Sequence, residues 1–258
     1  MPATSFTVTR DQIIHSALRK LGVLVIGDTP DATTIANAAL VLNLFIKQMA
    51  TEGLKLWTID EGVLPYTPNQ TMYVLGGPDT DYFYNANDPL KVAVTNKPLK
   101  VIQAFLRNTS VTPNIDIPMQ LISKQEYNIL GSKFSTGMSN TVFYDVRQNS
   151  GNLYIFLTPN EFVTDTYELH FVYQRPVYDV TAASSIPEFP NEWMNTLVWN
   201  LADQLAVEYS CPMNVRQEIA QRAQAYRDQL TDWDVEVVST FFQPDVRGLM
   251  QGYGNVVN

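Results

Sequence analysis

Apolar residues recur at helical spacing through residues 189–209, and the rest of the chain is best understood around this segment. Trp193, Leu197, Leu201 and Leu205 recur at every fourth position, and the positions one step round the helix are also apolar. The apolar arc is wider than the single stripe of a surface helix, so other elements must cover it on several sides. We therefore predict that this segment is the central helix of a small bundle.

Three further helices are predicted around it. Thr9 and Gln12 have capping-box spacing, and they open a first helix over residues 10–22. A Thr-Pro pair predicts the start of a second helix over residues 30–53. The last helix covers residues 212–234, where apolar residues are spaced three or four apart along an amphipathic face.

The second helix is apolar almost all round. Such a helix is either central in its own domain or shared with a neighbouring subunit, and in a unit of only two N-terminal helices the shared arrangement is favoured. We predict that its outward residues form a subunit interface: Leu40, Val41, Leu44 and Phe45.

Between residues 56 and 187 the apolar period falls towards two, and β-branched and aromatic residues collect in short runs. Short connections favour antiparallel pairing, a short helix is predicted at residues 124–130, and the turn-rich residues 76–90 are predicted to form an exposed loop. The predicted strands are 56–64, 71–75, 99–107, 118–122, 141–147, 152–158 and 166–175.

These elements predict an α+β fold: a bundle of four main helices, with an antiparallel β-rich domain inserted between the second and third helices, and an extended C-terminal arm. The helical domain comprises residues 1–55 and 188–234, the inserted domain residues 56–187, and the arm residues 235–258. Trp57 stands where the second helix meets the first strand, so we predict that it packs at the domain junction.

The arm has many apolar residues but the period of neither a helix nor a strand. Its prolines and glycines would let it follow an irregular groove on a partner, or it could fold back on its own subunit. We predict a docking arm for another protein, carried by Phe241, Phe242, Val246, Leu249, Met250 and Tyr253.

Composition narrows the function. The chain has 258 residues, of which 45% are hydrophobic, and a net charge of -9. Broad nucleic-acid binding depends on basic side chains, so the acidic balance argues against it, although DNA could still slide past. The longest apolar run is far too short to span a membrane. A single cysteine, Cys211, fits a reducing compartment.

The sequence offers little for catalysis. His15, His170 and Cys211 have no metal-site spacing, and we interpret both histidines as structural. Gly76 and Gly77 lack the Lys-Ser/Thr of a phosphate loop. We therefore predict no catalytic residue, no metal and no cofactor. The competing enzyme hypothesis is a small hydrolase or lysin with a β-rich substrate domain, which would need carboxylates clustered in a cleft.

Several segments resemble one family in their order: ALRKLGV, EGLKLW, PNQTMYVLG, KVIQAFLRN, PMQLISKQEYNIL, YDVRQNSGNLYIFLTP, FVYQRPVYDV and PNEWMNTLVWNLADQLAVEY. Together they resemble the head-to-tail adaptor proteins of tailed bacteriophages, the tail accessory factor or packaged-DNA stabilisation family. The resemblance spans almost the whole chain.

This resemblance implies a structural virion protein. It would be made in the host cytoplasm and assemble in the neck of the particle as a ring, usually of twelve copies. The ring would bind the portal protein of the capsid, through the arm, and offer a platform to the downstream tail or nozzle protein. It would prolong the channel for double-stranded DNA, without sequence-specific binding, and help to retain the packaged genome.

An alternative function is a tail-tip or receptor-binding module, in which Tyr82, Phe83 and Tyr84 of the β-domain stack on carbohydrate. The same three aromatic residues could instead pack the loop or contact another subunit.

Overall fold

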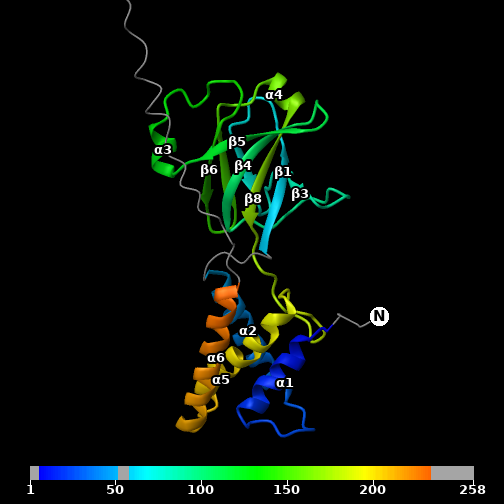
Figure 1. The fold of residues 1–258 in the computed structure, drawn as a ribbon, viewed down its shortest axis with the longest axis vertical. Helices are drawn as coiled ribbons and strands as arrows, with labels where there is room; N and C mark the ends of the chain where they lie inside the picture. The colour runs from blue at the N-terminus through cyan, green and yellow to red at the C-terminus, as the bar shows by residue number, and fades with distance from the viewer. Residues whose placement is uncertain (1–5, 52–57, 234–258) are drawn as a thin grey trace, which may run out of the picture.

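The computed structural model describes residues 6–51 and 58–233, which form a helical part and a sheet part at opposite ends of the molecule (Figure 1). The helical part contains α1 (Arg10–Lys20), α2 (Ala32–Thr51), α5 (Met194–Glu208) and α6 (Met213–Trp233). Each part has its own hydrophobic core. The chain enters the sheet part after α2 and returns to the helical part before α5.

Helix α5 lies at the centre of the helical part, packed against α1, α2 and α6, as predicted. A one-turn 3-10 helix, Asn191–Trp193, leads into it. Leu197, Leu201 and Leu205 are completely buried. Burying each such side chain stabilises the fold by about 1.5–3 kcal/mol, so this row of leucines contributes to the helical core.

One polar residue of α5 links it to α6. The Asn200 side chain is buried, and its Nδ2 donates hydrogen bonds to the carbonyl oxygens of Thr196 (2.9 Å) and Ala223 (3.4 Å). Its Oδ1 accepts from Arg227 at 2.6 Å. A buried amide is tolerated only when its donors and acceptor are satisfied. The bond to Thr196 lies within α5, and the bonds to Ala223 and Arg227 join α5 to α6.

The helix starts agree with the sequence in one case and differ in another. The Thr9 and Gln12 capping box of α1 is confirmed, with both reciprocal hydrogen bonds formed. Helix α2 begins at Ala32, two residues later than the Thr-Pro pair predicts. Hydrogen bonds from Thr34 and Thr33 lower the pKa of the Asp31 carboxyl, as expected for an N-cap residue.

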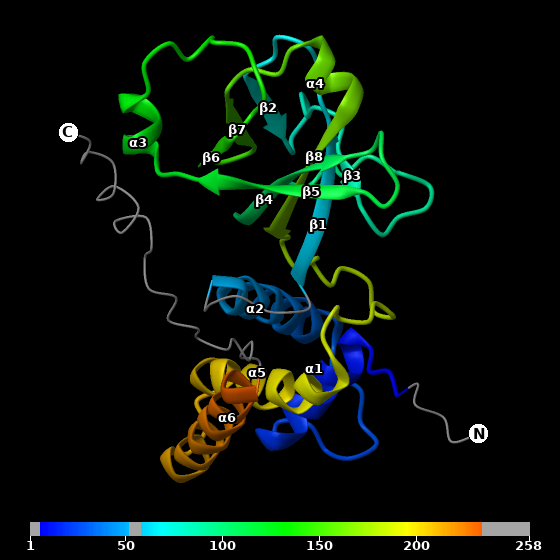
Figure 2. The same ribbon diagram turned by 45° about the horizontal axis from the view of Figure 1, so that its top comes forward.

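The sheet part is a single eight-stranded sheet in the order β2-β7-β6-β5-β4-β8-β1-β3. It curls towards a half-barrel, and Figure 2 shows its strands above the helical part. The strands are β1 (Ile59–Pro65), β2 (Met72–Leu75), β3 (Tyr84–Asn85), β4 (Lys100–Asn108), β5 (Ile115–Leu121), β6 (Thr141–Val146), β7 (Gly151–Phe156) and β8 (Tyr167–Gln174). Two short helices lie between strands, α3 (Lys124–Ile129) and α4 (Glu161–Thr166).

The predicted fold class is wrong. The described residues form six α-helices and one mixed, curled sheet, not a four-helix bundle with an inserted antiparallel β-domain. Strands β5 and β6 are parallel, because the segment between them, which contains α3, crosses over instead of turning back. The six residues of α4 are too few to show a helical period. In Figures 1 and 2 the long helices cross one another, whereas bundle helices lie within about 20° of parallel.

The predicted exposed loop at residues 76–90 is also wrong in part. It contains the short strand β3, and Phe83 is completely buried. The Phe83 ring packs against the rings of Phe171 (5.6 Å between centroids) and Tyr173 (6.1 Å) of β8. The segment is turn-rich in sequence, yet one aromatic side chain anchors it in the core of the sheet.

The returning segment between β8 and α5 is fixed to both parts. Arg175 contacts Asp60 of β1 (3.1 Å) and Glu188 (2.7 Å). On the helical side, Asn43 of α2 exchanges two hydrogen bonds with the backbone of Val180, and Lys47 donates to the carbonyl oxygen of Val177 at 2.9 Å. These side-chain contacts hold the segment against α2.

Candidate subunit interface

The exposed residues of α2 include two large apolar side chains, which lie beside the polar Thr33, Asn37, Lys47 and Gln48. Lys47 is the single charged residue in this helix of 20 residues. Leu40 and Leu44 lie one turn apart and are 61% and 62% exposed. A helix on the surface of a monomer usually turns charged residues to water. The α2 ridge, defined as Leu40 and Leu44, is therefore a candidate contact surface.

The structure separates the four residues that the sequence predicts as a subunit interface. Leu40 and Leu44 are exposed, Val41 is half-buried, and Phe45 is only 2% exposed. Phe45 packs in the core of its own chain, beneath the guanidinium of Arg227. Its assignment to an interface is therefore wrong, because a side chain with no free surface cannot contact another copy. Apolar residues occupy so much of the circumference of α2 that the sequence does not distinguish inward from outward residues.

A shallow pocket of about 220 Å³ adjoins the ridge between α2 and α5. Leu44 forms part of its wall, and Glu208 of α5 lies on the opposite wall. Glu208 is exposed, and it makes no ion pair within the part of the chain that the structure describes. The ridge therefore ends beside an unpaired negative charge.

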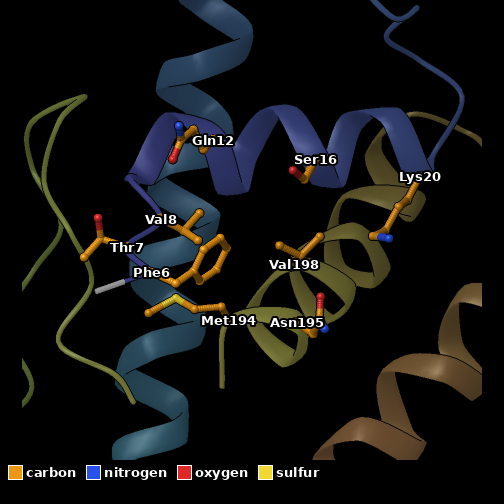
Figure 3. A pocket seen from close by; sticks show the side chains of 9 residues that line it. All are labelled: Phe6, Thr7, Val8, Gln12, Ser16, Lys20, Met194, Asn195 and Val198. Carbon is orange, nitrogen blue, oxygen red and sulfur yellow. The ribbon is translucent and has the colours of Figure 1, made fainter. Parts of the chain in front are cut away.

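A second apolar surface lies between α1, α5 and the segment before α1 (Figure 3). This α1–α5 groove has a volume of about 430 Å³. Phe6 and Met194 lie at one end and Lys20 at the other, with Val198 between them. The full lining is Phe6, Thr7, Val8, Gln12, Ser16, Lys20, Met194, Asn195 and Val198.

The end of the groove at Lys20 is basic. The Lys20 ammonium lies 3.9 Å from the centroid of the Trp199 ring, and the Arg222 guanidinium lies 5.1 Å from the same ring. Burial lowers the pKa of Lys20, and the charge of Arg222 lowers it further. Arg222 pairs with Glu218, whereas Lys20 has no carboxylate partner among residues 6–51 and 58–233.

The sequence did not point to this groove. Its lining comes from segments almost 200 residues apart, and each contributes residues with an ordinary role in a helix. The one local signal is the apolar pair Phe6 and Val8 before the capping box of α1, since an apolar residue directly before an N-cap, here Val8, often packs onto its helix.

The titratable side chains of the sheet form a structural network. His170 lies between Val63 and Phe105 on the neighbouring strands, and its Nδ1 is 2.6 Å from Oε1 of Glu61. Arg107 lies 3.6 Å from the same carboxylate and makes two hydrogen bonds of 2.8 Å to Asp116. These bonds lower the pKa of Asp116 and raise that of Arg107. The network connects four adjacent strands, in agreement with the structural role predicted for His170.

No group of three or more His, Cys, Asp and Glu side chains within residues 6–51 and 58–233 could hold a metal ion. In the same ranges, no helix is both long enough and apolar enough to cross a membrane. His15, the other histidine, is half-buried on α1.

The aromatic residues of the carbohydrate hypothesis do not form an open platform. Phe83 and Tyr84 are buried, and only Tyr82 is exposed, at 49%. The Tyr82 hydroxyl donates to the carbonyl oxygen of Lys91 at 2.8 Å. Because stacking on a sugar needs free ring faces, the packing of Phe83 and Tyr84 removes the main support for that alternative.

Two predicted features lie outside the described residues. Trp57, the predicted domain junction, is one. The other is the predicted docking arm, with Phe241, Phe242, Val246, Leu249, Met250 and Tyr253. Both stay predictions.

No protein-family model matches the chain, and no curated protein matches it. The function must therefore be argued from the surfaces described above and from the resemblance of the sequence segments.

Proposed function

We propose that this chain is a structural virion protein of a tailed bacteriophage, not an enzyme. It forms a ring adaptor that joins the capsid portal to the tail, prolongs the DNA channel and helps to retain packaged DNA. The observation that carries the proposal is the α2 ridge, an exposed apolar surface on a helix with almost no charge. Exposing two leucines to water is unfavourable in free energy. Contact with another copy removes them from water, so they favour association of copies.

The charge of the chain supports a passage for DNA. Copies that each carry a net charge of -9 would repel phosphate around a shared channel. Basic surfaces would instead hold the duplex, since phosphate contacts dominate DNA affinity. Acidic subunits therefore suit double-stranded DNA that moves through the ring without sequence-specific binding.

The proposed partners use different parts of the chain. The arm, residues 235–258, would bind the portal protein, and the sheet part would meet the downstream tail or nozzle protein. Around α3, Ile129 and Phe134 are 74% and 83% exposed, which supports an apolar contact on that side. The finished protein would reside in the neck of the virion after synthesis in the host cytoplasm.

The experiment compares the mass of the purified wild-type protein with that of a Leu40→Asp, Leu44→Asp double variant, by mass photometry. Wild type should form a closed oligomer of about a dozen copies, alone or when mixed with portal protein. The double variant should remain monomeric with an unchanged melting temperature, because both side chains are exposed. Leu90→Asp is the matched control: Leu90 is 81% exposed in the sheet part, and its replacement should leave assembly intact. Wild type that stays monomeric with and without portal protein would overturn the proposal.

A further inference from the structure

Two uncovered apolar surfaces lie on the helical part, and they share no residue. One is the α2 ridge, which protrudes, and the other is the α1–α5 groove, which is hollow. Neither Leu40 nor Leu44 lines the groove, so the ridge does not fill the groove of its own chain. A protruding surface and a hollow one on the same molecule can join successive copies head to tail.

The two surfaces match in size. An engineered apolar cavity of about 150 Å³ holds benzene, so the groove of about 430 Å³ has room for two leucine side chains. Leu40 and Leu44 are separated by four helical residues, or about 6 Å along the axis. The apolar lining of the groove, from Phe6 and Met194 to Val198, offers carbon atoms to both.

The two surfaces also match in charge. The groove ends at Lys20, and the ridge ends beside Glu208. Within the described ranges neither side chain has an ion-pair partner, although the shared Trp199 ring brings a second cation, Arg222, close to Lys20. Arg222 already pairs with Glu218, so a carboxylate entering at this end would offset the charge of Lys20.

We propose that the α2 ridge of one copy packs into the α1–α5 groove of the next copy, where Glu208 of the first pairs with Lys20 of the second. This inference rests on the proposed ring, and it specifies which surfaces meet. The contact is heterologous, since each copy uses one surface for one neighbour and the other surface for the other neighbour. Repetition of such a contact closes a ring when the rotation between copies divides a full turn.

Charge reversal tests the pairing, with mass photometry over a dilution series as the readout. Lys20→Glu and Glu208→Lys should each weaken assembly by about tenfold or more, because each places like charges together in a partly desolvated contact. The double variant carries both reversals in every copy, so each contact again joins opposite charges. It should recover assembly to within about threefold of wild type.

Two controls keep the outcome interpretable. Lys124→Glu reverses a lysine that is 65% exposed in the sheet part and should not change assembly. Melting curves check folding, and if Lys20→Glu lowers the melting temperature, Glu208→Lys carries the test alone, because Glu208 is exposed.

The outcomes separate this inference from the proposed function. Single variants that assemble like wild type, or a double variant that does not recover, would overturn the ridge-in-groove contact while the ring itself stands. A wild type that never assembles, even with portal protein, would overturn both.

Discussion

Adjacent residues of α2 have opposite environments, with Leu44 exposed to solvent and Phe45 buried in the helical core. Phe45→Ala should lower the free energy of unfolding of the dilute subunit by about 3–5 kcal/mol, because it leaves a cavity. Leu44→Ala should change it by less than about 0.5 kcal/mol. Urea unfolding at a concentration where the protein is monomeric measures both. Equal effects of the two substitutions would contradict the packing described for α2.

Buried tyrosines make the sheet sensitive to alkaline pH. Burial raises the pKa of Tyr73 to about 12, and its hydroxyl exchanges hydrogen bonds with the backbone of Thr67. An unfolded tyrosine has a pKa near 10, so the folded state favours the neutral phenol. The resulting stability is fully present below about pH 10 and is lost as pH rises towards 12. Unfolding free energies measured between pH 9 and 11.5 should fall, and the fall should be shallower in Tyr73→Phe. Identical slopes would show that Tyr73 ionises in the folded protein as it does in the unfolded chain.

At the scale of elements, the β6–β7 hairpin depends on one glycine. A Cβ at Gly151 would overlap the ring of Tyr144, whose hydroxyl donates to the carbonyl oxygen of Pro98 at 2.6 Å. Gly151→Ala should therefore destabilise the protein by about 1–3 kcal/mol, the usual cost of overpacking. Gly131→Ala is the control, because a Cβ there meets no atom within 4 Å. Thermal unfolding that cannot distinguish the two variants would contradict the close approach.

The arm can be tested as a separate element. Deletion of residues 241–258 should leave the melting temperature nearly unchanged, while particles assembled with the truncated protein should fail to retain it. Quantitative immunoblots of purified particles give the second result. A truncated subunit that no longer folds would instead show that the arm packs on its own chain, the other interpretation of its sequence.

The local elements of this fold could be predicted, and their assembly could not. The spacing of apolar residues predicted α5 and most strands, because a helix and a strand each bury residues at their own period. The parallel pairing of β5 with β6 leaves no such mark, since it depends on how the segment around α3 crosses the sheet. The orientation of Phe45 was also hidden, because α2 is apolar on nearly every side. The α1–α5 groove escaped prediction because it joins Phe6 and Lys20 to Met194 and Val198 from a distant segment.

At the scale of the whole molecule, the helical part and the sheet part have separate cores and distinct proposed roles. The helical part carries the ridge and the groove, the two surfaces proposed to join copies. The sheet part exposes Ile129 and Phe134 near α3, far from that contact in Figure 1. Under the proposed function, this division would let one part build the ring while the other meets the next tail component.

The most direct test of the central claim is cryo-electron microscopy of particles that contain this protein, with an antibody fragment marking its sheet part. We predict a closed ring between the capsid portal and the tail, with rotational symmetry in end-on projections and density for the DNA channel on its axis. Fragment density at the distal tip of the tail, or particles with a single copy and no ring, would contradict the account.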